Sequence, residues 1–221
     1  MLIDIEGTDG SGKATQTKLL FNYLTGLGYK CKLISFPNYA SPSSGPVKMY
    51  LAGELGENSN ITGHQASVLY AVDRLATMRQ VDVDNYDFIL FDRYTPSNMI
   101  YQSTRLKTNK EIDEFLAWVS DFEYGKLKLP RPDKIVFLDM PVEFSEKLAR
   151  ARGELKNGMK KDILEVTSEQ QKAYASAKYV AKKDNWITIS CVDKGLKSIE
   201  QIHKEILTNL GLLCNINQQE I

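Results

Sequence analysis

The chain of 221 residues is 43% hydrophobic and 25% charged, which is ordinary for a soluble globular protein. Lys plus Arg number 28 and Asp plus Glu number 28, so no net charge attracts the chain to nucleic acid or to an anionic membrane. Three scattered cysteines and two histidines leave little for a zinc site or a histidine-based triad, and indicate a reducing, cytoplasmic compartment. No run of residues approaches membrane-spanning length, and the first predicted strand begins so near the N-terminus that we expect no signal peptide.

A glycine-rich loop follows this first predicted strand and leads into the first predicted helix. It contains the spacing G-x-x-x-x-G-K, which is typical of the phosphate-binding loops of nucleotide kinases and nucleoside triphosphatases. Glycines let the backbone approach phosphates closely, while the helix start and the lysine ammonium add positive charge. The next residue is Ala14, where the pattern has the Ser or Thr that holds magnesium. We expect the donor triphosphate to be bound by Gly7, Asp9, Gly10, Ser11, Gly12, Lys13, Ala14 and Thr15.

The next segment predicts a strand over residues 30–36, a long polar loop over residues 37–46 and a helix over residues 64–81. Loops that leave strand ends on the phosphate side of such a sheet bind substrates, although this composition fits a surface connection equally well. On the helix, Tyr70 and Arg74 lie one turn apart, where a ring and a guanidinium could stack on a base and bond to its edge. A core tyrosine and an arginine that reaches solvent fit the same pattern, so both interpretations stay open.

An apolar strand predicted over residues 86–91 leads to Asp92 and Arg93 at the carboxyl edge of the sheet. An acidic residue at this point is typical of the second magnesium-handling group in such folds, and Arg93 is placed to bridge phosphates. A structural ion pair between these residues and other side chains is the alternative. A further helix is predicted to begin near Thr95.

Four stretches together resemble the thymidylate kinase family, and they occur in the family's order over nearly the whole chain. They are residues 7–16, Phe36-Pro37, residues 69–74 and residues 92–102. The resemblance implies transfer of the γ-phosphoryl group of ATP to dTMP, giving ADP and dTDP, with Mg²⁺ as cofactor. It also implies a homodimer.

The same resemblance implies how the acceptor is bound. The aspartate that matches Asp9 binds the 3′-hydroxyl of the thymidylate sugar in this family. The aromatic residue that matches Tyr70 stacks on thymine, and the arginine that matches Arg74 reads the carbonyl edge of the base.

Further members of the acceptor site follow from the fourth stretch. The residues that match Ser97 and Asn98 lie against the base, and the one that matches Tyr101 occupies the place of a ribose 2′-hydroxyl. The arginine that matches Arg93 contacts the phosphates. The expected acceptor-binding residues are Asp9, Phe36, Pro37, Tyr39, Tyr70, Arg74, Arg93, Ser97, Asn98, Tyr101 and Gln102.

A basic segment over residues 149–161 follows a helix predicted to begin at Pro141. Its composition is typical of a mobile flap that closes over a triphosphate, although a solvated charged loop has the same composition. The segment resembles the lid of those thymidylate kinases whose catalytic arginine lies in the lid, and Gly10 leaves no basic residue after Asp9 in the phosphate loop. The resemblance therefore implies that Arg152 is catalytic and that Arg150 assists at the donor.

The remaining segments predict core elements. These are a helix over residues 109–122, strands over residues 135–139 and 186–189, and two helices with capping-box starts at Thr167 and Ser198. Strands that alternate with helices predict a doubly wound α/β fold, in which a five-stranded parallel sheet has helices on both faces.

We therefore expect one kinase domain over residues 1–221, with an acceptor-binding region at about 37–83 and a lid at about 149–162. Within this domain Lys13, Arg93 and Arg152 would neutralise phosphate charge, and Asp92 would hold hydrated magnesium through water. The expected partners are the small molecules dTMP and ATP.

Two other functions remain open at this point. A deoxynucleoside kinase also has a phosphate loop, an acidic residue beside an arginine, and an arginine-containing lid. A non-catalytic nucleotide-binding protein is suggested by Ala14, although the presence of Lys13, Asp92, Arg93 and Arg152 together argues against it. A switch GTPase is disfavoured because the sequence has no Asn-Lys-x-Asp motif.

Overall fold

Five parallel strands form the centre of the structure, a computed structural model that describes residues 1–56, 60–151 and 163–213. The strands are β1 (Leu2–Glu6), β2 (Cys31–Ser35), β3 (Phe88–Asp92), β4 (Lys134–Asp139) and β5 (Ile187–Ser190). They pair in the order β2-β3-β1-β4-β5, which confirms the predicted five-stranded parallel sheet. Because β1 is the central strand, the glycine-rich loop leaves the sheet at the middle of its carboxyl edge.

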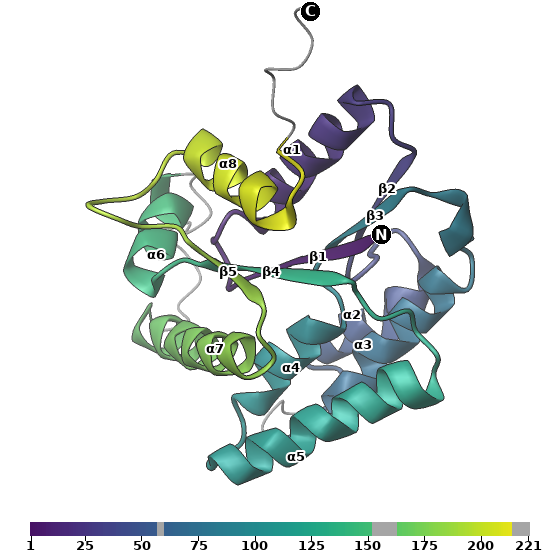
Figure 1. Ribbon diagram of the computed structural model, residues 1–221. Coiled ribbons are helices and arrows are strands. Elements are labelled where there is room, and N and C mark those ends of the chain that lie inside the picture. The colour runs from purple at the N-terminus through teal and green to yellow at the C-terminus, as the bar shows by residue number, and fades with distance from the viewer. Residues whose placement is uncertain (57–59, 152–162, 214–221) are drawn as a thin grey trace, which may run out of the picture.

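Helices cover both faces of this sheet, as predicted. They are α1 (Lys13–Gly26), α2 (Gly45–Leu51), α3 (Gly63–Met78), α4 (Thr95–Ser103), α5 (Asn109–Ser120), α6 (Val142–Ala151), α7 (Ile163–Lys183) and α8 (Ile199–Leu210). Figure 1 shows α1 and α8 together on one face, and α3, α4, α5 and α7 on the other. Within the described ranges, no helix is long and apolar enough to cross a membrane.

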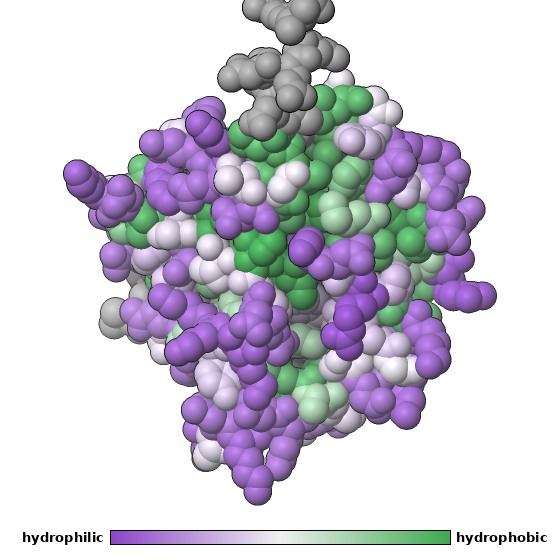
Figure 2. Space-filling view, viewed as in Figure 1, coloured by the Kyte–Doolittle hydropathy of each residue, from purple (hydrophilic) through white to green (hydrophobic). Residues whose placement is uncertain are grey.

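Successive side chains of each strand point to opposite faces of the sheet, so the hydrophobic core has a separate cluster on each face. Ile3 and Ile5 of β1 are fully buried in a cluster with Leu24 of α1 and residues of α8. On the opposite face, Phe137 of β4 is buried in a cluster with Phe115 of α5 and residues of α4 and α7. In the space-filling view, apolar residues form a band down the middle of the molecule between polar flanks (Figure 2).

β1 also carries two carboxylates into the interior, because Asp4 and Glu6 alternate with its two isoleucines. Both acidic residues are 0% exposed. Glu6 has hydrogen-bond partners, whereas both carboxyl oxygens of Asp4 lack one in the part of the chain that the structure describes. Burial raises the pKa of Asp4 well above its ordinary value, and Glu6 and Asp92 raise it further. Burial among these carboxylates therefore favours the neutral form of the Asp4 carboxyl group.

The structure corrects one predicted helix start. The capping-box pattern at Thr167 predicts that a helix begins there, but α7 begins at Ile163 and runs through Thr167. Residues 163–166 read Ile-Leu-Glu-Val, so no Gly or Pro stops the helix from extending toward its N-terminus. The capping box predicted at Ser198 does form, with the Ser198 side chain accepting from the Gln201 N–H.

A second difference concerns the end of the helix predicted over residues 109–122. The α-helical part ends at Ser120, and a π-helical turn follows over Asp121–Lys126. The wider turn buries Glu123, which is 0% exposed, although the residues beside it in sequence are only partly buried.

Candidate active site

The loop between β1 and α1 has the geometry of an anion-binding turn. Gly10 and Gly12 have φ angles of 78° and 91°, in the left-handed region that favours glycine. At Gly10 an added Cβ would also lie 3.1 Å from the Ser145 carbonyl oxygen. No side chain caps the start of α1, so its first N–H groups are available to an anion.

Lys13 folds back against this loop. It is 6% exposed, and its Nζ donates a hydrogen bond of 2.7 Å to the Thr8 carbonyl oxygen. Burial and the nearby Arg93 guanidinium lower the pKa of Lys13 to about 7, although Asp9 and other carboxylates oppose the shift. A bound phosphate would favour the protonated ammonium again. Ala14 and Thr15, the next two residues, are exposed.

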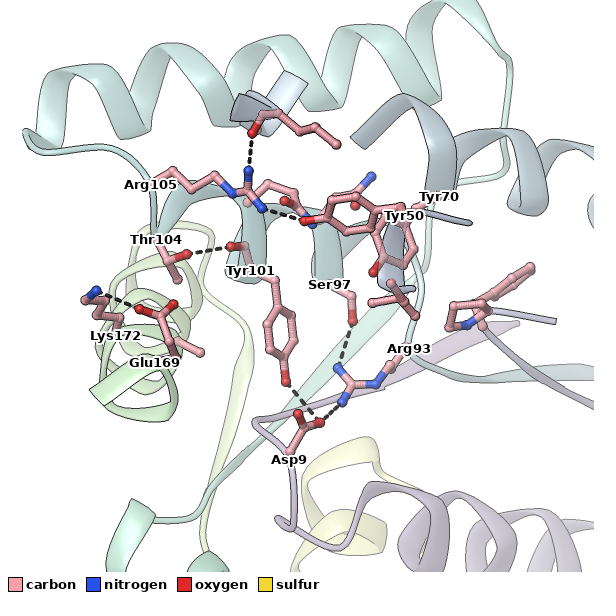
Figure 3. A pocket seen from close by; sticks show the side chains of 18 of the residues that line it. Asp9, Tyr50, Tyr70, Arg93, Ser97, Tyr101, Thr104, Arg105, Glu169 and Lys172 are labelled. Carbon is pink, nitrogen blue, oxygen red and sulfur yellow. Dashed lines mark hydrogen bonds and ion pairs between the residues drawn. The ribbon is translucent and has the colours of Figure 1, made fainter. Parts of the chain in front are cut away.

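A cavity of about 1170 Å³ opens beside the loop, at the carboxyl ends of β1, β2 and β3. Figure 3 shows Asp9 and Arg93 at one end of this cavity and Tyr50 and Tyr70 at the other, with Tyr101 between them. All the expected acceptor-binding residues line it: Asp9, Phe36, Pro37, Tyr39, Tyr70, Arg74, Arg93, Ser97, Asn98, Tyr101 and Gln102. The structure thus brings these residues together, and their contacts with an acceptor stay predictions.

Arg93 connects the phosphate loop to this cavity. Its guanidinium forms an ion pair with Asp9 and lies 5.0 Å from the centre of the Tyr101 ring (Figure 3). Burial lowers the pKa of Arg93, but Tyr101, Asp9 and Glu6 raise it by more, so the net shift is upward. Arg93 is therefore a permanent cation.

Glu6 is linked to Arg93 through the Ser97 hydroxyl. Its carboxylate accepts a hydrogen bond of 3.1 Å from the Tyr94 N–H and one of 2.7 Å from the Ser97 hydroxyl. The Ser97 oxygen in turn lies 3.5 Å from Nη1 of Arg93. Burial raises the pKa of Glu6, and Arg93 and Ser97 oppose that shift. The Ser97 hydroxyl is thus engaged with the groups that hold Arg93.

Arg74 lines the same cavity and is held by a buried carboxylate. Its Nε and Nη2 each donate a hydrogen bond of 2.7 Å to Glu123, whose carboxylate also accepts from Thr95 and Asn98. Arg74 is 2% exposed, so it does not reach solvent, and the alternative of an arginine whose head is in water is wrong. Tyr70, one turn earlier, is half-buried and lines the same cavity.

Tyr70 packs edge-on against Tyr50, with ring centroids 6.2 Å apart and an interplanar angle of 79°. Burial raises the pKa of Tyr70 to about 12, and Tyr50 and Tyr39 raise it as well. The phenol is therefore neutral, and its ring presents an uncharged face to the cavity. Arg105 donates hydrogen bonds to the Tyr50 hydroxyl and to the Ile61 carbonyl oxygen. These bonds hold the Tyr50 ring in position against Tyr70.

Sequence reasoning missed Glu6, Glu123, Tyr50 and Arg105. Glu6 could have been found, because an acidic residue ends an apolar strand directly before the glycine-rich loop. Glu123 lies between two aromatic residues in a segment without a clear helical or strand period, and Tyr50 and Arg105 lie in segments that show no motif. No local pattern indicated these three residues.

Two predicted cationic residues cannot be placed. Arg152 lies outside the described residues, and Arg150 lies in α6 with a side chain that the structure does not describe.

Asp92, the predicted magnesium-handling residue, ends β3 directly opposite Ile5 of β1. Burial raises the pKa of Asp92, against the opposing effects of Lys13 and Arg93. Among the residues that the structure describes, no group of three or more His, Cys, Asp and Glu could hold a metal ion. One carboxylate at this position fits a hydrated Mg²⁺ that is bound mainly through phosphates.

Comparisons with known proteins identify the family. A model of the thymidylate kinase family matches residues 5–206. The chain belongs to the thymidylate kinase family. It is 30% identical over 203 residues to the thymidylate kinase of Mycobacterium tuberculosis, covering 88% of this chain and 94% of the relative. It is also 30% identical over 211 residues to a probable thymidylate kinase of Methanococcus aeolicus, covering 94% of each chain.

A solved structure shows that the fold is shared. Thymidylate kinase from Candida albicans superimposes with a TM-score of 0.67 at 24% identity, covering 96% of this chain and 92% of the other. The five-stranded sheet with helices on both faces is therefore the fold of this kinase family.

The Arg74–Glu123 pair predicts a large loss of stability in one variant. Arg74→Ala should lower the free energy of unfolding by about 3–5 kcal/mol, because it leaves Glu123 as an unpaired buried carboxylate. A matched control is Arg79→Ala at the exposed end of the same helix, which should change stability by less than about 0.5 kcal/mol. Urea unfolding followed by circular dichroism measures both. Equal losses in the two variants would show that the pair does not stabilise the fold.

Proposed function

We propose that this protein is a thymidylate kinase, which transfers the γ-phosphoryl group of ATP to dTMP and yields ADP and dTDP. One observation carries the proposal. The cavity joins a phosphate-binding loop at one end to a tyrosine and an arginine at the other, in a chain of the thymidylate kinase family. These two ends suit the phosphate and the base of a single nucleotide.

The acceptor would lie along this cavity. Tyr70 would stack on thymine, and Arg74 would donate to a base carbonyl from the far end. Asp9 would accept from the 3′-hydroxyl of the sugar; its side chain is 62% exposed even while paired with Arg93, so a hydroxyl can reach it. Tyr101 lies across Arg93, where it would occupy the place of a 2′-hydroxyl.

The donor would lie over the glycine-rich loop. Phosphoryl transfer depends mainly on positioning and on charge neutralisation, because the protein forms no covalent bond to the phosphoryl group. The described cations for this role are Lys13 and Arg93, which face a common set of carboxylates. Arg152 would join them from a lid over about residues 149–162, and Arg150 would assist.

Magnesium would be held through water by Asp92 and directly by the phosphates. This ion bridges phosphate oxygens and neutralises the charge that develops there. Ala14 cannot supply a ligand, so Asp92 carries more of the binding than it would beside a Ser or Thr. Thr15 lies about 100° further round the helix and does not replace the missing hydroxyl.

A coupled assay across nucleoside monophosphates and nucleosides tests the function. We expect ADP formation from ATP with dTMP as acceptor, and much slower formation with thymidine. Faster reaction with thymidine would indicate a deoxynucleoside kinase instead. ATP binding without ADP formation for any acceptor would indicate a binding protein.

The metal site gives a second test. Asp92→Asn should raise the Mg²⁺ concentration required for half-maximal rate, and adding Ala14→Thr should partly restore it, because the new hydroxyl supplies a ligand. Initial rates over a Mg²⁺ titration measure this change. An unaltered Mg²⁺ dependence in Asp92→Asn would contradict the assignment. Activity in Ala14→Thr but not in the natural chain would favour the binding-protein alternative.

A homodimer through α2 and α3 completes the proposal. These helices pack on each other and expose large apolar side chains, among them Leu51 (53%), Val68 (38%) and Val72 (43%). Val68 and Val72 lie one turn apart, so they form one apolar stripe that a second copy of the chain could cover. Sedimentation equilibrium should give twice the chain mass, and Val72→Glu should shift it toward the monomer. A monomeric natural protein would refute this part.

The proposed compartment is the cytoplasm. Cys31 and Cys191 are free thiols in the structure, and Cys191 is buried. Free thiols suit a reducing compartment, where the substrates ATP and dTMP are also expected.

A further inference from the structure

The Glu123 carboxylate is surrounded by hydrogen-bond donors from two helices. Oε1 accepts from Nη2 of Arg74 at 2.7 Å and from Nδ2 of Asn98 at 2.8 Å. Oε2 accepts from Nε of Arg74 at 2.7 Å and from Oγ1 of Thr95 at 2.8 Å. Each oxygen therefore has two donors, and Glu123 is 0% exposed. Glu123 does not line the cavity itself, but Arg74 and Asn98 both do.

These bonds determine which polar groups remain for a ligand. A guanidinium only donates. Within the described part of the chain, the one hydrogen bond of Arg74 Nη1 is a long one of 3.4 Å to the Tyr94 carbonyl oxygen. A donor of Arg74 is thus left for the cavity.

Asn98, in contrast to Arg74, has no donor left for a ligand among its described contacts. Its Nδ2 donates to Glu123 and, at 3.1 Å, to the Ser67 carbonyl oxygen, so both amide hydrogens are used. Both partners can only accept, so the amide cannot be turned over without losing two hydrogen bonds. Asn98 can therefore present only its carbonyl oxygen, an acceptor, to a ligand.

We infer that Glu123 is a positioning residue that sets the hydrogen-bonding polarity of the base-binding end of the cavity. It leaves Arg74 as a donor next to Asn98 as an acceptor. The edge of thymine offers the complementary pair, a C4 carbonyl beside an N3–H. Cytosine offers an amino group beside an unprotonated N3. It would therefore set a donor against the Arg74 donor and an acceptor against the Asn98 acceptor. This inference rests on the proposed function, because it takes a pyrimidine nucleotide as the acceptor.

The π-helical turn is the structural device that provides this carboxylate. α5 ends at Ser120, and the turn over Asp121–Lys126 directs Glu123 into the interior. Its neighbour Phe122 stacks on Trp118, with ring centroids 5.1 Å apart, on the α5 side. Such turns frequently occur at functional sites. A buried ion pair is often replaceable by apolar residues without loss of stability, so stability alone gives little reason for this arrangement.

Glu123→Gln tests the inference, because it keeps the shape but replaces one acceptor by an amino donor that must face Arg74, Asn98 or Thr95. The KM for dTMP should rise about 10- to 100-fold, the range for a lost charged hydrogen bond. The kcat and the KM for ATP should stay within about threefold, because the phosphate end is untouched. The ratio of kcat/KM for dTMP over dCMP should fall at least about tenfold, since Asn98 becomes free to turn over. Calorimetric titration with dTMP and with dCMP in the absence of ATP should show the same change in affinity.

Two further variants separate positioning from general loosening. Val180→Ala in α7 creates a space in the core cluster that contains Phe115 of α5 and Phe137 of β4. This variant should have a lower melting temperature and an unchanged dTMP over dCMP ratio. Thr95→Val removes one donor to Glu123 at nearly constant volume, and should raise the KM for dTMP in the same direction by a smaller factor. If Glu123→Gln does not fold, Thr95→Val alone decides the question.

The outcomes are distinct from those that test the function. A natural chain that does not phosphorylate dTMP overturns the proposed function. A natural chain that phosphorylates dTMP, with a folded Glu123→Gln variant whose KM and dTMP over dCMP ratio are unchanged, overturns only the role of Glu123. A Val180→Ala variant that shifts the ratio as much as Glu123→Gln also overturns it.

Discussion

Parallel pairing of β1 with β3 is the constraint on which the site depends. It sets Ile5 opposite Asp92, so the two strands end side by side at one edge of the sheet. The glycine-rich loop leaves one strand there and Arg93 follows the other, which lets Arg93 pair with Asp9 although 84 residues separate them. β2 extends the same edge, with Ser35 opposite Asp92, so Phe36 and the loop after it border the same cavity.

Charged side chains lie at both ends of the cavity, and the two groups are balanced in different ways. Arg74 and Glu123 form a closed bidentate pair at the end of the cavity that we propose binds the base. At the end proposed for the phosphates, Arg93 and Lys13 face Glu6, Asp9 and Asp92 without such closure, so the cations remain close to where phosphates would bind. A rigid pair suits recognition of a fixed base edge, and a looser group of charges suits phosphates that arrive and leave.

The local sequence pattern was sufficient to predict those elements whose shape is set by their own residues. The loop at residues 7–13 could be predicted because glycines at fixed spacing and one lysine specify its shape. The five strands could be predicted because each is a short segment built around Ile, Leu, Val or Phe, and helix α8 because its capping box at Ser198 forms as written. The same pattern at Thr167 failed, because a capping box marks a helix start only where the chain before it leaves the helix.

The sequence by itself determined the fold class and the phosphate loop, since each depends on spacing along the chain. The resemblance to the thymidylate kinase family implied the acceptor-binding residues, which line the cavity, but not Tyr50 or Arg105 beside them. Tertiary structure alone decided which side chains meet. Glu123 is 49 residues from Arg74, and a π-helical turn that no periodicity signals carries it inward. Whether Arg74 reached water or a buried carboxylate therefore depended on a partner that only the packing of α3, α4 and α5 brings near, because hydrogen bonds and ion pairs act over a few ångströms and not along the chain.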